Sequence, residues 1–212
     1  DDDFGLEVKD GGEAALKELG MKYAEVTTFK RGATDFSSQV ARMKNANCDV
    51  VVMGTIIRET IGTVATARKL GFNPEFIGST ASYDGIIAKL GGAAVNGYYS
   101  TCQISFPYAD DASKSVRDWH ARYKEKFKED PTLFSVYGQI IISLFAAAAE
   151  KAGPNLNPDT LDKAIESLTV PRDMFGGDAQ TFGPKKHLGA TRAKLCQIQN
   201  GRWVSITDYI AN

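Results

Sequence analysis

The spacing of apolar residues alternates between helical and strand-like along the first hundred residues of the chain. Val8, Gly12, Ala15 and Leu19 recur at helical spacing, and Gly20 follows where a helix would end. Further helices are predicted around residues 36–43 and 61–70 and in a short stretch that ends at Leu90, and short strands at residues 23–29, 49–53, 75–78 and 97–102. We therefore expect helices and strands to alternate in this half of the chain.

This alternation predicts an α/β fold with a doubly wound, mostly parallel sheet and right-handed connections. The continuous apolar run DVVVM at residues 49–53 suits a strand that is covered on both faces. Such a sheet normally starts with a strand, whereas the first predicted element here is a helix. We therefore expect a strand upstream, and we expect the chain, which opens on three aspartates, to be a mature or truncated part of a longer protein.

The second half follows a different pattern, which predicts long helices and a hairpin. Residues 116–127 form an amphipathic stretch, and residues 133–151 are apolar nearly all round, which favours a helix buried on most sides. Asn157 and Pro158 predict the start of a third helix. The pair Asn200-Gly201 between two strand-like runs predicts a type I′ hairpin.

Composition narrows the class of partner. The 212 residues are 43% hydrophobic and 24% charged, and the net charge is −1. This balance gives no general attraction to nucleic acid or to an acidic membrane surface. The longest apolar stretch, residues 140–149, is too short to cross a bilayer. The three cysteines, an odd number with wide spacing, predict buried reduced thiols and no disulfide framework.

Candidate chemistry is sparse, so we predict that the protein is not an enzyme and holds neither a metal nor a cofactor. The two histidines are His120, expected on the solvent face of an amphipathic helix, and His187, in a loop. Neither has an acid at a spacing that would orient it for catalysis or complete a metal site. No glycine-rich phosphate loop follows a predicted strand.

A binding site is the remaining prediction, because ligands of open α/β sheets bind beyond the carboxyl ends of the strands. Small polar groups and one cation, with an apolar residue among them, follow three predicted strands there, and they are Thr55, Ile56, Arg58, Ser79, Thr80 and Gln103. They could line a small-molecule cleft. Helix capping by the hydroxyl side chains and simple solvation of the arginine remain open as alternatives.

Five segments together resemble one known family. They are DDDFGLEV, TDFSSQVARMKNANCDVVV, FIGST, YGQIIISLFAAAAEKAG and QIQNGRW. In this order they resemble the bacterial leucine/isoleucine/valine-binding proteins, type I periplasmic binding proteins that serve ABC importers. The resemblance covers nearly the whole chain and corresponds to the later part of the family sequence.

The resemblance implies two Rossmann-like lobes that close on a ligand between them. Residues 1–104 and 190–212 would form the second lobe, and residues 105–189 the C-terminal share of an incomplete first lobe. It also implies a protein that has lost a signal peptide, works in the periplasm or otherwise outside the cytoplasm, and has a small-molecule ligand and ABC permease subunits as partners.

Four positions correspond by this resemblance to pocket positions of the family. Phe4, Ile56 and Tyr137 stand where the family places aromatic side chains near the ligand, and Thr80 stands where amino-acid binders place an acid for the ammonium group. Since a buried ammonium without an acid is costly, Thr80 favours a small organic acid, such as an aromatic one, over a branched-chain or aliphatic amino acid. A ligand-sensing regulatory domain of the same fold is the alternative function, and the sequence settles neither ligand nor oligomeric state.

Overall fold

The computed structural model describes residues 1–210, which form two compact units. Unit 1 consists of Asp1–Cys102 and Lys194–Asp208, and unit 2 consists of Gln103–Ala193 and the residues from Tyr209 onward. The chain therefore passes between the units three times, after Cys102, after Ala193 and after Asp208.

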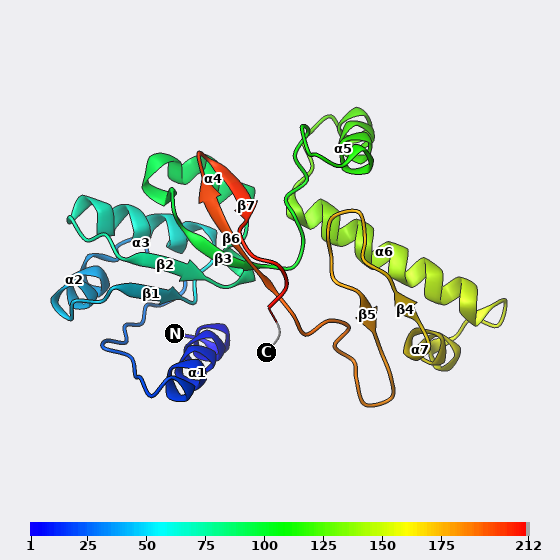
Figure 1. Cartoon of the computed structure of the whole chain (residues 1–212), viewed down its shortest axis with the longest axis horizontal. Helices are drawn as coiled ribbons and strands as arrows, with labels where there is room; N and C mark the ends of the chain where they lie inside the picture. The colour runs from blue at the N-terminus through cyan, green and yellow to red at the C-terminus, as the bar shows by residue number, and fades with distance from the viewer. Residues whose placement is uncertain (211–212) are drawn as a thin grey trace. The chain divides into compact units, whose positions relative to one another are not determined.

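Unit 1 is built on a five-stranded sheet with the order β1-β2-β3-β6-β7 (Figure 1). The strands are β1 (Val50–Met53), β2 (Glu75–Gly78), β3 (Tyr99–Cys102), β6 (Lys194–Gln199) and β7 (Arg202–Ser205). The first three are parallel, and the last two add an antiparallel hairpin to β3. The predicted α/β fold with a mostly parallel sheet is confirmed.

Four helices accompany this sheet: α1 (Asp3–Glu18), α2 (Ser37–Asn45), α3 (Ile57–Lys69) and α4 (Gly85–Gly91). Two 3₁₀ turns, η1 (Thr80–Ser82) and η2 (Gly92–Val95), lie before and after α4. The predicted apolar stripe of Phe36, Val40 and Met43 is buried, as the amphipathic pattern requires. Gly20 and Gly71 have positive φ values of 67° and 66°, so both helix ends predicted from glycine are confirmed.

One predicted strand is wrong. Residues 23–29 form no strand, because no neighbouring strand offers its backbone a partner in the part of the chain that the structure describes. An apolar groove separates this segment from β1, and Val26, Phe29, Val50 and Val52 are among the residues that line it. β1 is consequently an edge strand, and the side chains of Val50 and Val52 are exposed.

The C-terminal hairpin is confirmed, and it brings a second correction. Asn200 and Gly201 have φ values of 52° and 76°, the left-handed conformations that a type I′ turn needs. β6 lies beside β3 with Cys196 opposite Ser100, and Cys196 forms a disulfide with Cys102. The prediction of reduced thiols is therefore wrong for these two cysteines, because strand pairing brings residues 94 apart in sequence to a Cα–Cα distance of 6.0 Å. Only Cys48 is free.

Unit 2 contains α5 (Lys114–Phe127), α6 (Leu133–Ala152), α7 (Pro158–Glu166) and a small sheet of β4 (Thr169–Val170) and β5 (Gln180–Thr181). Asn157 accepts a hydrogen bond from the backbone N–H of Thr160 and caps α7 with Pro158 behind it, as predicted. His120 is buried in α5, with Nε2 at 3.7 Å from Oδ1 of Asp130, so its predicted place on the solvent face is wrong.

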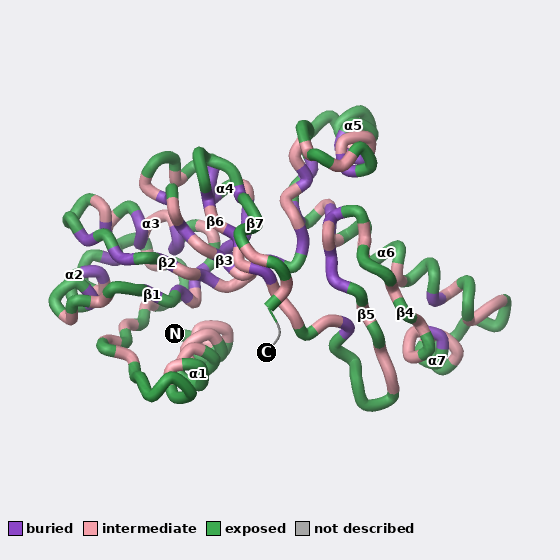
Figure 2. The backbone as a smooth tube through the Cα atoms, in the orientation of Figure 1, coloured by how far each residue is buried: buried purple, intermediate pink, exposed green. Residues whose placement is uncertain are grey.

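The prediction that α6 is buried on most sides is also wrong for this unit. Leu133, Val136 and Ala148 are its buried residues, whereas Phe134 is 72% exposed. Figure 2 shows most of α6 in the colours of exposed and intermediate residues. The reason is geometric, since α7 packs against α6 but leaves the opposite apolar face uncovered among the described residues. By length and composition alone, α6 is the one helix in residues 1–210 that could cross a membrane, a test that helices of soluble domains also pass.

Candidate ligand-binding site

A small pocket of unit 1 opens beyond the carboxyl end of β1. Local structure places its lining residues: Asp2 caps α1 by accepting the N–H of Gly5 at 2.9 Å, which sets Phe4 in the first turn. Ile56 is the N-cap residue of α3. The complete lining is Asp1, Asp2, Phe4, Phe29, Arg31, Gly54, Thr55, Ile56 and Glu59. The structure thus brings together three residues predicted to bind ligand, Phe4, Thr55 and Ile56.

A chain of buried hydroxyl groups stands behind this pocket. The side chains of Thr55 and Thr60 share a hydrogen bond of 2.7 Å, and Thr60 donates to the carbonyl of Ile56 at 2.8 Å. Tyr98 donates to Ser82 at 2.9 Å, and burial raises the pKa of Tyr98 to about 12. The hydroxyl of Thr55 therefore stabilises the loop after β1, and Thr55 forms part of the pocket wall.

Glu59 is one of the six lining residues that the sequence did not predict, and it is the most deeply buried carboxylate among them. Its side chain lies in the first turn of α3 and is 1% exposed. Neither carboxylate oxygen has a hydrogen-bond partner among the described residues. The sequence feature that could have indicated Glu59 is its position: an acidic residue three positions after Ile56, at the start of the helix that follows a buried strand.

Two arginines lie near the pocket and differ in their roles. Arg31 pairs with the carboxylate of Asp2, and the pKa of Asp2 is lowered by the backbone hydrogen bond from Gly5 and then by Arg31. The side chain of Arg58 is 66% exposed, and its guanidinium lies 3.7 Å from Glu59 Oε1, beyond hydrogen-bond range. The predicted binding residue Arg58 is thus beside the pocket but does not line it.

The other residues predicted to bind ligand lie elsewhere. Ser79 caps η1 through the N–H of Ala81, and the hydroxyl of Thr80 lies 3.1 Å from that of Thr101. Both follow β2 and are absent from the lining of the pocket at β1. Gln103 and Tyr137 belong to unit 2. The side chain of Gln103 is exposed, and the buried hydroxyl of Tyr137 has no hydrogen-bond partner within residues 1–210.

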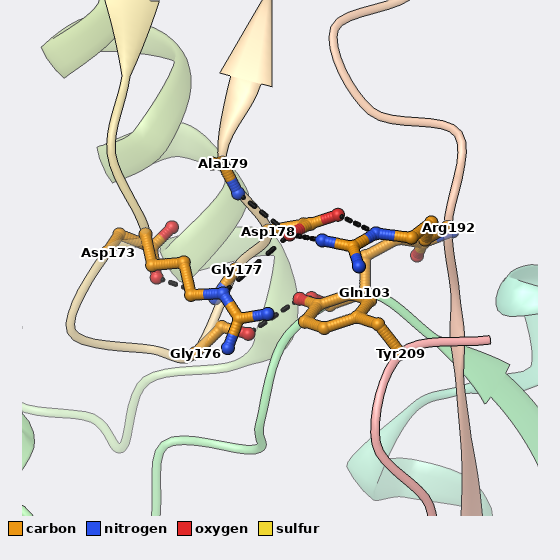
Figure 3. Close-up of polar contacts among 9 residues, drawn as sticks. Gln103, Asp173, Gly176, Gly177, Asp178, Ala179, Arg192 and Tyr209 are labelled. Atoms are coloured by element: carbon orange, nitrogen blue, oxygen red, sulfur yellow. Dashed lines mark hydrogen bonds and ion pairs between the residues drawn. The ribbon is translucent and has the colours of Figure 1, made fainter. Parts of the chain in front are cut away.

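Unit 2 holds a second polar cluster, centred on Asp178 (Figure 3). Asp178 Oδ2 accepts Nε of Arg192 at 2.8 Å, and Oδ1 accepts the terminal nitrogen Nη2 at 2.6 Å. The backbone N–H of Ala179 donates to Oδ1 at 2.9 Å. The Arg192 hydrogen bonds, before all other causes, hold the pKa of Asp178 below its usual value. Both oxygens of this carboxylate therefore accept hydrogen bonds that stabilise the fold of unit 2.

Tyr209 completes this cluster and joins distant segments of unit 2. Its hydroxyl lies 2.6 Å from both the carbonyl of Gln103 and that of Gly176, and its single proton serves one of them at a time. The guanidinium groups of Arg172 and Arg192 lie 5.3 and 5.4 Å from its ring centroid. Burial raises the pKa of Tyr209 to about 12. Because Gln103, Arg192 and Tyr209 stand next to the three passages between the units, the cluster ties these passages together on the unit 2 side.

No group of three metal-binding side chains occurs among the described residues. Neither polar cluster contains a nucleophile paired with a base. The pocket at β1 combines three apolar side chains, Phe4, Phe29 and Ile56, with polar and charged groups, which is an arrangement suited to holding a small molecule.

Comparison with known proteins shows the family of this chain. The sequence profile of the family described as periplasmic binding protein matches residues 1–202. The chain belongs to this family. Two curated relatives from Brucella are a Leu/Ile/Val-binding protein homolog 1 of Brucella suis, 25% identical over 82% of this chain, and a homolog 8 of Brucella abortus, 21% identical over 97%. The matches cover 45% and 52% of those relatives, so the chain spans about half their length.

Solved structures show the same fold. A leucine-binding protein from Thermotoga maritima superposes with a TM-score of 0.82 at 19% identity, covering 99% of this chain and 57% of that one. A fatty acid ABC transporter substrate-binding protein from Thermomonospora curvata gives 0.83 at 21% identity, covering 100% and 56%. The substrates that these two proteins are named for differ in chemistry, so the shared fold does not select a ligand for this chain.

Proposed function

We propose that the protein is the extracytoplasmic substrate-binding component of an ABC importer, and that it binds a small organic acid or a branched-chain or aliphatic amino acid without chemical change. The observation that carries this proposal is the pocket beyond the carboxyl end of β1, where Phe4 and Ile56 offer apolar surface to a solute. Family membership supports a solute-binding role, and the permease partners and the location outside the cytoplasm are parts of the proposal.

Binding can be tested on the chain of residues 1–212 by saturation-transfer difference NMR, which detects millimolar affinities. The panel would contain leucine, valine, hexanoate and phenylacetate. At least one solute should bind, and Ile56→Ser should weaken it at least fivefold because the substitution removes apolar surface from the pocket wall. Ile86→Ser is the matched control, since Ile86 is also an exposed isoleucine of unit 1 but lies outside the pocket.

Transport can be tested in the source organism with the radiolabelled solute that binds. Deletion of the gene should reduce uptake, and complementation with the Ile86→Ser gene should restore it, whereas the Ile56→Ser gene should restore it poorly. Binding without any effect on uptake would keep the solute-binding role and refute the importer role.

A further inference from the structure

Five buried hydroxyl groups form a cluster at the carboxyl ends of β1 and β2. The hydroxyl cluster consists of Thr55 after β1, Thr60 in α3, Ser82 in η1, Tyr98 just before β3 and Ser100 in β3, and each of these residues is at most 5% exposed. Buried polar groups need hydrogen-bond partners, and apolar side chains would fill the same space without that requirement. The direction of the hydrogen bonds therefore shows what the cluster holds.

One half of the hydroxyl cluster holds the loop after β1. Thr60 donates its only hydroxyl proton to the carbonyl of Ile56 at 2.8 Å. The 2.7 Å hydrogen bond between Thr60 and Thr55 therefore has Thr55 as its donor. Thr55 and Ile56 both line the pocket beyond β1, so these two bonds fix the backbone that carries part of the pocket wall.

The other half of the hydroxyl cluster holds the loop after β2. Ser82 and Ser100 each donate to the carbonyl of Ser79 at 2.8 Å. Ser79 follows the last residue of β2, and Ser82 lies in the 3₁₀ turn that comes next. Two buried donors on one carbonyl therefore fix this loop as firmly as the first one.

Tyr98 lies between the two halves. Its hydroxyl donates to Ser82 at 2.9 Å. Burial raises the pKa of Tyr98 to about 12, and hydrogen bonding with Thr60 and Thr55 is among the effects that oppose this rise. Gly78 leaves the space for this hydroxyl, because a Cβ there would lie 2.0 Å from the oxygen of Tyr98 and 2.2 Å from that of Ser82. One hydroxyl thus interacts with both loops.

We propose that Tyr98 is a positioning residue of the candidate binding site: its hydroxyl couples the loop after β1, which carries Ile56, to the loop after β2, and so holds the pocket wall in the shape that receives a solute. This inference rests on the proposed solute-binding function and adds to it a residue outside the pocket lining. A wall that is ordered in advance favours binding, because less conformational freedom is lost when the solute arrives.

Tyr98→Phe removes the hydroxyl and keeps the ring. The matched control is Tyr23→Phe, because the hydroxyl of Tyr23 donates to the carbonyl of Lys9 at 3.0 Å in the same unit and Tyr23 does not line this pocket. Each substitution removes one hydrogen bond from unit 1, so thermal melts of both variants would show how much each lowers stability.

The coupling would be measured by NMR hydrogen exchange at the backbone amides of Thr60 and Ser82. These amides donate to the carbonyls of Ile56 and Ser79 at 2.9 Å, so each reports on one of the two loops. Exchange of the β6 amides is the internal reference for global unfolding. Affinities for leucine, valine, hexanoate and phenylacetate would be measured by NMR titration of the 212-residue chain, at a temperature at which every variant is folded.

We expect Tyr98→Phe to accelerate exchange of both amides about tenfold relative to β6, and to weaken the solute that binds by about fivefold or more. Tyr23→Phe should change the relative exchange of both amides and the affinity by less than about twofold. A Tyr98 with a packing role alone would accelerate the two amides only as much as those of β6.

Three results overturn the inference. Acceleration of the Ser82 amide alone would show that the loops are not coupled. Acceleration of both amides with an unchanged affinity would show that the coupling does not shape the site, and the proposed function would stand. If none of the four solutes binds, the role of Tyr98 in a binding site falls together with the proposed function, whereas the amide rates show separately whether the loops are coupled.

Discussion

At the residue scale, two carboxylates show how a local environment assigns a role. Asp178 is buried and satisfied, because Arg192 gives it two hydrogen bonds and Ala179 a third. Glu59 is more deeply buried, at 1% exposed against 8% for Asp178, and has no such donors among the described residues. The first carboxylate is satisfied within the fold, whereas the second keeps unused hydrogen-bonding capacity.

The Asp178–Arg192 pair should make stability depend on pH. Since the folded-state pKa of Asp178 is lowered, the pair contributes stability above the unfolded pKa of about 3.9 and loses it as the pH falls through the folded value. Asp178→Asn should therefore lower the melting temperature at pH 7, and the difference from the wild type should shrink below about pH 4. Thermal melts from pH 2.5 to 8 would show this. The exposed Asp162→Asn is the control, and an Asp178→Asn deficit that does not change with pH would contradict the prediction.

Tyr137 permits a test of a buried hydroxyl without a partner. Burial raises the pKa of Tyr137, and its hydroxyl makes no hydrogen bond within residues 1–210. Tyr137→Phe should leave the free energy of unfolding unchanged or raise it by up to about 1 kcal/mol, because an unsatisfied polar group is removed.

Tyr98→Phe provides the matched comparison for that measurement. Its hydroxyl is also buried but donates to Ser82 at 2.9 Å, so its loss should cost about 0.5–1.5 kcal/mol in urea denaturation. If Tyr137→Phe destabilises as much as Tyr98→Phe, the hydroxyl of Tyr137 has a partner. If Tyr137→Phe instead weakens solute binding without affecting stability, the predicted contact between Tyr137 and the ligand is supported.

At the scale of elements, the position of a helix or strand in the fold decides how much of its apolar surface is covered. β1 and α6 are both strongly apolar in sequence, yet each has one uncovered side in the described structure. On β1 the uncovered residues are Val50 and Val52, while Val51 and Met53 are buried. The hydrophobic pattern predicted the elements correctly, but pattern alone does not tell which neighbours will be present.

The uncovered face of α6 should make the 212-residue chain self-associate. Phe134, Ile141, Ile142 and Phe145 are exposed along it, and contiguous apolar patches of this kind promote association. Ile142→Lys should reduce both sedimentation-detected oligomers and binding of the dye 1-anilinonaphthalene-8-sulfonate, and it should change stability by less than about 0.5 kcal/mol.

The control for this prediction is Val136→Lys, which introduces a charge at a buried position of the same helix. It should destabilise unit 2 strongly, since the charge has no partner there. A monomeric wild-type chain that binds no dye would show that the face is covered in solution.

At the scale of the whole molecule, contacts within unit 1 and contacts within unit 2 link the segments at which the chain passes between the units. In unit 1 the disulfide joins Cys102, at the first passage, to Cys196, near the second. In unit 2 the hydroxyl of Tyr209 contacts the carbonyl of Gln103, and Ala193 pairs with Ile210 through backbone hydrogen bonds. These contacts restrain segments that are far apart in the sequence.

Removal of the disulfide should therefore cost substantial stability. It closes a loop over a sequence separation of 94, so Cys102→Ser should lower the free energy of unfolding by about 2–5 kcal/mol. Cys48→Ser, which alters only the free cysteine, should have little effect. Denaturation with and without dithiothreitol would measure both, and a wild-type chain insensitive to the reductant would refute the prediction.

The sequence by itself determined what depends on local spacing and turn chemistry. The strand at residues 75–78, the buried stripe of Phe36, Val40 and Met43, the cap at Asn157 and the turn at Asn200-Gly201 follow from periodicities and backbone preferences that need no distant partner. The family could also be predicted, because several such segments occur together in one order.

Only the tertiary structure decided which distant residues meet. It pairs Cys102 with Cys196, leaves residues 23–29 outside the sheet, and buries His120 and Glu59. Burial and pairing depend on contacts between segments far apart in sequence. The local spacing of apolar and polar residues does not reveal these contacts. For this reason Phe4, Thr55 and Ile56 could be named from the sequence as residues near a pocket, while the buried carboxylate of Glu59 in the same lining became visible only in the fold.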